Sequence, residues 1–357
     1  MTETKVISSD ELAVYDRQIR LWGLEAQNRL RNSSVLLYGM TPLGAEIGKN
    51  LMLCGLNALT VADGCLVEEN DVNFLIDVKK DVRKNRAVAS YDRLRVLNPL
   101  VKLETVKKRH MELTAEYLKE YDLVILVDQG KDIIKSVDAI CRENKIRFIA
   151  GGIFGWTGYA FFDFDGFEFL VPAPKEHALV DEKKEDEKQA AESPSKKAKL
   201  DDDISNGKQI ETVTLEEDNA KIKKSIRYPS FIDSLVFEPE KLTKGLIRRL
   251  KPANFIIANA CLHLEHKFGH EISADDFQDF VKLHASNPLQ KLATDALNND
   301  FEVITDPPLP ATCAIVGGVL SQEAIKSLSQ NDTPHKNFFA YNAVESMGYI
   351  YDLPLIK

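Results

Sequence analysis

The chain has 357 residues, of which 44% are hydrophobic and 28% are charged, and its formal net charge is −9. This composition is typical of globular proteins, and the acidic balance argues against nucleic acid as the main partner, because phosphate binding needs a basic surface. No run of 18 apolar residues occurs, so we expect a soluble, intracellular protein without a membrane-spanning segment. The cysteines form no CxxC pair, which disfavours a cysteine zinc site or a disulfide framework: Cys54, Cys65, Cys141, Cys261 and Cys313.

A helix is expected to start at residues 8–11, where two serines precede two acidic residues. Its apolar residues recur at helical spacing and form one stripe: Leu12, Tyr15, Ile19 and Trp22. At about 100° per residue, Arg17 lies on the opposite side of the helix from this stripe. A second short helix is expected over 23–31.

A strand–turn–helix–strand pattern follows. An apolar strand over 34–38 leads into a turn from Gly39 to Gly44, a helix over 45–54 and a strand over 59–63. Strands that alternate with helices predict an α/β fold with a doubly wound, mostly parallel sheet. The other expected elements are strands over 123–127, 147–150, 337–341 and 348–352, helices over 83–97, 133–144 and 311–329, and an antiparallel hairpin formed by 156–164 and 167–171.

The composition changes sharply in the middle of the chain. Residues 175–207 carry dense runs of both charges and no aromatic residue, which predicts a disordered surface insertion. It separates a Rossmann-like domain over 1–174 from residues 208–357, a mainly helical region whose C-terminal part returns to the first domain. Within the insertion, Lys196-Lys197-Ala198-Lys199 resembles a short nuclear-import signal, so we expect the protein in the nucleus; a solvated charge run is the alternative.

The turn Gly39-Met40-Thr41-Pro42-Leu43-Gly44 has the context of a dinucleotide-binding fingerprint. It follows a strand and opens a helix, and Asp63 ends the next strand, where an acidic residue contacts the ribose. The middle glycine is missing: Thr41 adds a side chain where the backbone must approach phosphate, and Pro42 removes an N–H donor. Two interpretations remain open here. The turn is either the nucleotide site of a stand-alone adenylating enzyme or NAD-dependent oxidoreductase, or a Rossmann-type turn that has lost its ligand.

The segment Tyr15-Asp16-Arg17-Gln18-Ile19-Arg20-Leu21-Trp22-Gly23 is more specific. It resembles the opening signature of the small, regulatory subunits of enzymes that activate ubiquitin-like proteins, in the superfamily of the bacterial adenylating enzymes of molybdopterin and thiamine biosynthesis. The similarity covers nearly the whole chain outside the charged insertion. The chain length and the last segment, Pro334-His335-Lys336-Asn337-Phe338-Phe339, are most similar to SUMO-activating enzymes, in which a small non-thioester subunit forms a heterodimer with a large catalytic subunit.

The resemblance implies a Rossmann-like adenylation fold whose local ATP and magnesium machinery is degenerate. Active members carry a GxGGxG-type turn, an Asn-Leu-Asn-Arg-Gln segment, a lysine before an alanine, and an Asp-Asn pair followed by an arginine. Here residues 71–75 lack the Arg-Gln pair, Arg86 stands in place of the lysine, and Asp128 precedes Gln129. The resemblance therefore implies no cofactor and no metal in this chain, ATP and magnesium in the partner, and a vestigial cofactor-binding role for three residues: Gly39, Gly44 and Asp63.

The resemblance also implies a catalytic role for Arg17. In the family this arginine reaches from the small subunit into the partner's ATP site, where the C-terminal carboxylate of SUMO attacks the α-phosphate. A guanidinium fork can stabilise the charge that gathers on phosphoryl oxygens. Arg20, about 60° further round the helix, is expected at the interface. The alternatives for Arg17 are a solvated helix arginine and a subunit that acts as a scaffold only. Cys313 is the best placed cysteine, but packing is its expected role.

Overall fold

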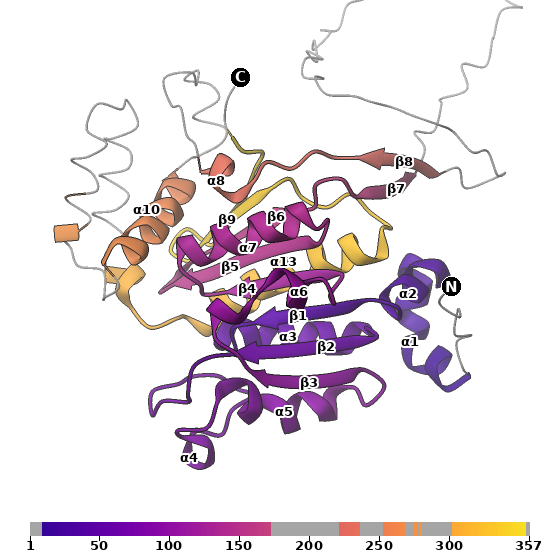
Figure 1. The fold of residues 1–357 in the computed structure, drawn as a ribbon, viewed down its shortest axis with the longest axis horizontal. Helices are drawn as coiled ribbons and strands as arrows, with labels where there is room; N and C mark the ends of the chain where they lie inside the picture. Colours follow the sequence, from indigo (N-terminus) through magenta and orange to yellow (C-terminus); the bar gives the residue numbers. More distant parts are fainter. Residues whose placement is uncertain are drawn as a thin grey trace, which may run out of the picture.

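The computed structural model describes residues 9–172, 221–235, 253–268, 275–276, 279 and 302–354, which build an eight-stranded sheet (Figure 1). The strand order is β10-β9-β6-β5-β4-β1-β2-β3. The five strands from β5 to β3 are parallel, and β6, β9 and β10 continue the sheet as antiparallel strands. The expected mostly parallel sheet is confirmed. Its strands are β1 (Ser34–Tyr38), β2 (Ala58–Asp63), β3 (Lys102–Lys107), β4 (Leu123–Val127), β5 (Arg147–Phe154), β6 (Thr157–Asp163), β9 (Phe338–Asn342) and β10 (Met347–Tyr351).

Helices cover both faces of the sheet, because successive strand residues point to opposite sides. Leu37 of β1 and Ile125 of β4 belong to one hydrophobic core, with residues of α3, α5 and α13, whereas Leu36 and Val124 belong to a second core with residues of α7 and α10. Strands β1 and β4 are therefore buried on both faces of the sheet. The longer helices are α1 (Ser9–Trp22), α2 (Leu24–Leu30), α3 (Pro42–Cys54), α5 (Arg86–Leu97), α7 (Lys131–Glu143), α10 (Ala253–Phe268) and α13 (Pro310–Ser329).

Shorter helical segments in the described residues include α4 (Val78–Asp81), the 3₁₀ helix η1 (His110–Glu112), α6 (Ala115–Leu118) and α8 (Phe231–Ser234). In the described part of the chain, no helix combines the length and the apolar character that crossing a membrane requires.

The expected hairpin of 156–164 with 167–171 is wrong. Strand β6 is buried at every position and pairs with β5 on one side and with β9 on the other. No edge of β6 is left for the next strand. That strand, β7 (Glu168–Pro172), instead pairs antiparallel with β8 (Lys221–Ser225) in a separate two-stranded sheet.

Helix α3 starts three residues earlier than the sequence pattern indicated. Thr41 is its N-cap and Pro42 occupies the first helical position. Proline is favourable there, because the first helical N–H has no intrahelical acceptor and the fixed φ of proline suits the helix. The turn between β1 and α3 is consequently shorter than the sequence suggested.

The C-terminal strands β9 and β10 lie in the same sheet as β1, next to β6. Residues 302–354 thus complete the fold that the first half of the chain begins. The charged segment 175–207, expected to be a disordered insertion, lies outside the described residues, as does most of the expected helical stretch apart from α10.

Candidate functional site

The turn from β1 to α3 is closely packed against the end of β4. Gly39 has φ +103°, and a Cβ there would lie 2.4 Å from the carbonyl oxygen of Val127. A Cβ on Gly44 would lie 2.0 Å from the carbonyl oxygen of Gly39. Both glycines are therefore required by the packing of the turn itself, whether or not a nucleotide binds.

Thr41 and Pro42 change the donors that this turn offers to an anion. The Thr41 hydroxyl donates to the Asp128 carboxylate and accepts a hydrogen bond from the backbone N–H of Gly44 at 3.4 Å. Pro42 has no N–H at the first helical position. Helix N-termini bind phosphate through such backbone N–H groups, so one of these donors is absent here and another is engaged by Thr41.

Both carboxylate oxygens of Asp63 are engaged by the backbone. Oδ2 accepts from the N–H of Met40 at 2.6 Å, and Oδ1 accepts from the N–H of Cys65 at 2.7 Å. Asn73 adds a third link, because its Nδ2 donates to the carbonyl oxygen of Met40 at 2.9 Å. Asp63 is only 4% exposed. In this arrangement it holds the turn in place instead of presenting a free carboxylate to a ribose.

The charged residues near the turn are also paired internally. Arg86 forms a bidentate ion pair with Asp71, with Nε to Oδ2 at 3.0 Å and Nη2 to Oδ1 at 2.7 Å. Asp128 accepts from the N–H of Ile153 at 2.8 Å as well as from Thr41. Desolvation raises the pKa of Asp128 to about 6, although these hydrogen bonds oppose the shift. Asp128 thus links the turn to the backbone of β5. Among the described residues, no group of three or more His, Cys, Asp or Glu side chains is placed to hold a metal.

Arg17 lies on the exposed face of α1, while Tyr15 on the other face is 2% exposed. Arg20 pairs with Asp16 one turn earlier, with Nε to Oδ1 at 3.1 Å and Nη2 to Oδ2 at 3.0 Å. Arg17 has no hydrogen bond or ion pair to another residue of the described segments. Val14 and Leu21, one turn before and one turn after Arg17 on the same face, are exposed apolar side chains at 62% and 78%, and Leu24 at the start of α2 is 49% exposed.

Comparisons with known proteins give the family. The model of the ThiF family matches residues 15–353. SUMO-activating enzyme subunit aos-1 of Caenorhabditis elegans is 35% identical over 98% of this chain and 99% of its own length. SUMO-activating enzyme subunit 1 of Xenopus tropicalis is 35% identical over 98% of this chain and 97% of its own length. That of Homo sapiens is 33% identical over 96% of this chain and 95% of its own length. The chain belongs to the ThiF family, in its SUMO-activating enzyme subunit 1 group.

Solved structures support the fold of this chain. A crystal structure of PaaA is 16% identical with a TM-score of 0.53, and covers 98% of this chain and 85% of its own. A crystal structure of Escherichia coli MccB is 10% identical, also with a TM-score of 0.53, and the match covers 96% of this chain and 73% of the MccB chain. At these identities the likeness concerns the fold alone. The family and the Rossmann-like fold implied by the sequence resemblance are both confirmed.

The thiols of Cys54, Cys65 and Cys313 resist ionisation. Cys313 is 1% exposed, and burial raises the pKa of Cys313 and of Cys54 to about 12. Cys65 is exposed, but burial of its thiol and the neighbouring Asp63 charge raise its pKa too. A cysteine nucleophile needs a lowered pKa. These thiols therefore lack the property that a thioester-forming cysteine requires, and Cys313 packs in the core as expected.

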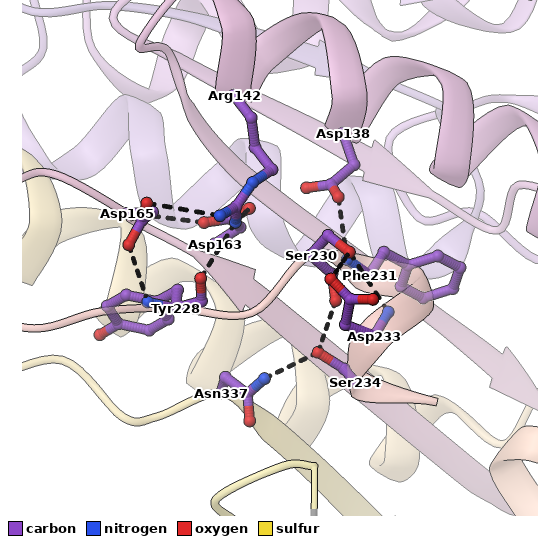
Figure 2. Close-up of polar contacts among 10 residues, drawn as sticks. All are labelled: Asp138, Arg142, Asp163, Asp165, Tyr228, Ser230, Phe231, Asp233, Ser234 and Asn337. Carbon is purple, nitrogen blue, oxygen red and sulfur yellow. Dashed lines mark hydrogen bonds and ion pairs between the residues drawn. The ribbon is translucent and has the colours of Figure 1, made fainter. Parts of the chain in front are cut away.

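Arg142, the first arginine after Asp128 in the sequence, is directed into a different cluster (Figure 2). Its guanidinium pairs with Asp163, lies 3.3 Å from Oδ2 of Asp165 and donates to the carbonyl oxygen of Tyr228 at 3.1 Å. Arg142 therefore joins α7 to the end of β6 and to the segment 226–235. It does not supply the arginine that adenylating members place after their Asp-Asn pair.

Asp138 lies beside this cluster on α7 (Figure 2). Its Oδ2 accepts from the N–H of Phe231 at 2.9 Å, whereas its buried Oδ1 has no hydrogen-bond partner among the described residues. Burial raises the pKa of Asp138 well above the ordinary range, and the Asp163 charge adds to the shift. The pKa of Asp163 is also raised by burial. Burial and the neighbouring Asp163 charge therefore favour the neutral form of Asp138.

Proposed function

We propose that this chain is the small, non-thioester subunit of a heterodimeric SUMO-activating enzyme and that it supplies Arg17 in trans to the ATP site of a large catalytic subunit. ATP, magnesium and the thioester-forming cysteine belong to that partner. The observation that carries the proposal is the difference between two neighbouring arginines. Arg20 is paired with Asp16, whereas Arg17 is exposed without a partner among the described residues.

The surface around Arg17 fits this role. Val14, Leu21 and Leu24 are exposed apolar side chains on α1 and just after it, and clustered apolar exposure marks interaction surfaces. An interface that buries these side chains would exclude water from the guanidinium. Charge-assisted hydrogen bonds become stronger in such surroundings, because the local dielectric constant falls.

The chemistry assigns a defined step to Arg17. An oxygen of the SUMO C-terminal carboxylate attacks the α-phosphorus of ATP, a P–O bond forms, and the bond to the bridging oxygen breaks as pyrophosphate leaves. Arg17 donates N–H groups to the phosphoryl oxygens on which charge accumulates. The partner's cysteine thiolate then attacks the acyl carbon of the adenylate, and AMP leaves as the thioester forms.

The vestigial role of Gly39, Gly44 and Asp63 is part of the same proposal. It is supported by the internal hydrogen bonds of Asp63 and by the missing N–H of Pro42. A stand-alone adenylating enzyme or an NAD-dependent oxidoreductase would need these groups free for a nucleotide. Calorimetric titration of the isolated chain separates the possibilities: we expect poor ATP binding, and micromolar affinity with adenylate formed in the absence of a partner would favour the stand-alone enzyme.

The experiment that tests the proposal itself compares Arg17→Ala with Arg20→Ala in a heterodimer reconstituted with the large subunit. ATP–pyrophosphate exchange reports adenylation before any transfer to the cysteine. We expect Arg17→Ala to slow exchange strongly and Arg20→Ala to have a small effect, because Arg20 is already paired on the surface of its own helix.

A further inference from the structure

The C-terminal end of α3 is capped by side chains from α1, from α2 and from the residue that follows α5. The last carbonyl groups of a helix have no intrahelical donor. At the end of α3, three consecutive carbonyl oxygens accept hydrogen bonds from side-chain amides. Met52 O accepts from Asn98 Nδ2 at 2.8 Å, Leu53 O from Gln18 Nε2 at 3.1 Å, and Cys54 O from Gln27 Nε2 at 3.1 Å. Gln18 belongs to α1, Gln27 to α2, and Asn98 directly follows α5. These amides therefore attach α1 and α2 to the Rossmann-like core.

Asn98 fixes the middle of α1. The same Nδ2 that binds Met52 O also donates to the Tyr15 hydroxyl at 2.9 Å. The Tyr15 ring packs on Gly55, where a Cβ would lie 2.6 Å from the ring, and Gly55 has φ +81° as the residue that ends α3. Both Tyr15 and Asn98 are buried, at 2% and 5% exposure. One point of α1, two residues before Arg17, is thus held by a hydrogen bond and a close ring contact.

Gln27 fixes the end of α1. Its Oε1 accepts from the indole N–H of Trp22 at 2.9 Å, while its Nε2 binds Cys54 O. Gln27 is 0% exposed, so both ends of a fully buried amide are used. Gln18 is less completely bonded, because its Oε1 is buried without a partner among the described residues. Gln27 is therefore the amide that ties the last residue of α1 to α3.

Arg17 lies between these two attachment points, on the opposite face of the helix. We propose that Gln27 and Asn98 are positioning residues for Arg17: they set where α1 presents its guanidinium, an inference that rests on the proposed function. Stabilisation of a transition state depends on placement, and a displacement of about 1 Å can slow a reaction by roughly 10²-fold. Neither amide touches the reacting groups, and both act through α1.

The test is a double-mutant cycle in ATP–pyrophosphate exchange by the reconstituted heterodimer. Gln27→Leu keeps a similar volume and removes both hydrogen bonds. We expect it to lower the turnover number of exchange by roughly 10-fold, within the range that misplacement of a catalytic group produces, with little change in the KM for ATP and in assembly of the heterodimer. In the Arg17→Ala background the same change should have no further effect, because there is no guanidinium left to position.

A milder variant keeps the inference testable if Gln27→Leu fails to fold. Tyr15→Phe removes the hydroxyl that accepts from Asn98 and keeps the ring on Gly55. We expect a few-fold slower exchange, again absent in the Arg17→Ala background. As a matched control, Asn254 of α10 is also a buried, hydrogen-bonded amide, 2% exposed and outside α1. Any fold-reduction in exchange rate caused by Asn254→Ala should be the same with and without the Arg17→Ala substitution.

The outcomes separate this inference from the proposed function. In one outcome, Arg17→Ala slows exchange, while Gln27→Leu or Tyr15→Phe slows it by the same factor with or without Arg17. That result overturns the positioning role and leaves the proposed function standing. If Arg17→Ala exchanges at the wild-type rate, both are overturned, because no catalytic arginine is being positioned. The positioning role is supported if Gln27→Leu and Tyr15→Phe slow exchange only when Arg17 is present, and if Asn254→Ala slows it by the same factor with or without Arg17.

Discussion

The hydroxyl group of Thr41 donates a hydrogen bond to the carboxylate of Asp128. The side chain that stands in place of a phosphate-turn glycine is therefore bonded to the acid that directly follows β4. In the proposed function, this internal bond is a physical reason for the loss of local ATP binding.

Thr41→Ala should destabilise the chain. The substitution removes the N-cap of α3, the acceptor for the Gly44 N–H and one donor to Asp128. Loss of such a cap costs about 1 kcal/mol. Chemical denaturation of wild type, Thr41→Ala and Thr41→Ser measures it. Ser keeps the hydroxyl and should retain most of the stability; an Ala variant as stable as wild type would show that this hydroxyl does not support the turn.

Asp138→Asn should change how stability depends on pH. The pKa of Asp138 is raised in the folded protein, whereas an unfolded aspartate titrates near pH 4. The folded state therefore binds the proton more tightly, and the protonated Asp138 stabilises the fold. This contribution to the free energy of unfolding is complete below about pH 4 and is lost as the pH rises through the raised folded pKa. Asn stays neutral and keeps an oxygen for the Phe231 N–H.

Thermal unfolding near pH 5 and near pH 8.5 measures this prediction. We expect Asp138→Asn to resemble wild type at the lower pH and to be the more stable protein at the higher pH. Parallel pH profiles for the two proteins would mean that Asp138 is ionised in the fold. The cluster of Figure 2 would then need another charge arrangement.

Deletion of residues 175–207 should leave SUMO activation intact and weaken nuclear import. The segment is dense in charge and lacks aromatic residues, and it contains the basic run Lys196-Lys197-Ala198-Lys199. Thioester yield on the partner and the cellular distribution of the tagged chain test the two halves separately. Loss of thioester formation contradicts the first half, and unchanged nuclear accumulation contradicts the second.

The sequence predicted elements well where burial alone decides the structure. The strands at 34–38 and 123–127 have the expected bounds, because each is a short apolar run between turn signals and lies in the middle of the sheet. The hairpin after residue 156 was predicted wrongly, since the partner of β6 is β9, which lies far along the chain. Long-range pairing of this kind leaves no local signal.

The candidate site was predictable only in part. The exposed position of Arg17 opposite Tyr15 follows from helical periodicity and is seen in the structure. Gln27 and Asn98 were missed, because a buried amide has no periodic signature and its partners are carbonyl groups of a distant helix. Asn98 directly follows the helix expected over 83–97, and its bond to Tyr15 depends on tertiary packing.

The most direct test of the central claim is the rate of ATP–pyrophosphate exchange by heterodimers that contain wild-type, Arg17→Ala or Arg17→Lys subunit. Loss of one charge-assisted contact to the transition state should cost roughly 2–4 kcal/mol, or about 10²–10³ in adenylation rate. The fold should be retained, because Arg17 lies opposite the face of α1 that packs on its own core, and we expect the heterodimer still to assemble. Lys should rescue little, since a point charge cannot reproduce a guanidinium fork. Exchange at the wild-type rate with Arg17→Ala would contradict the account and leave this subunit a scaffold.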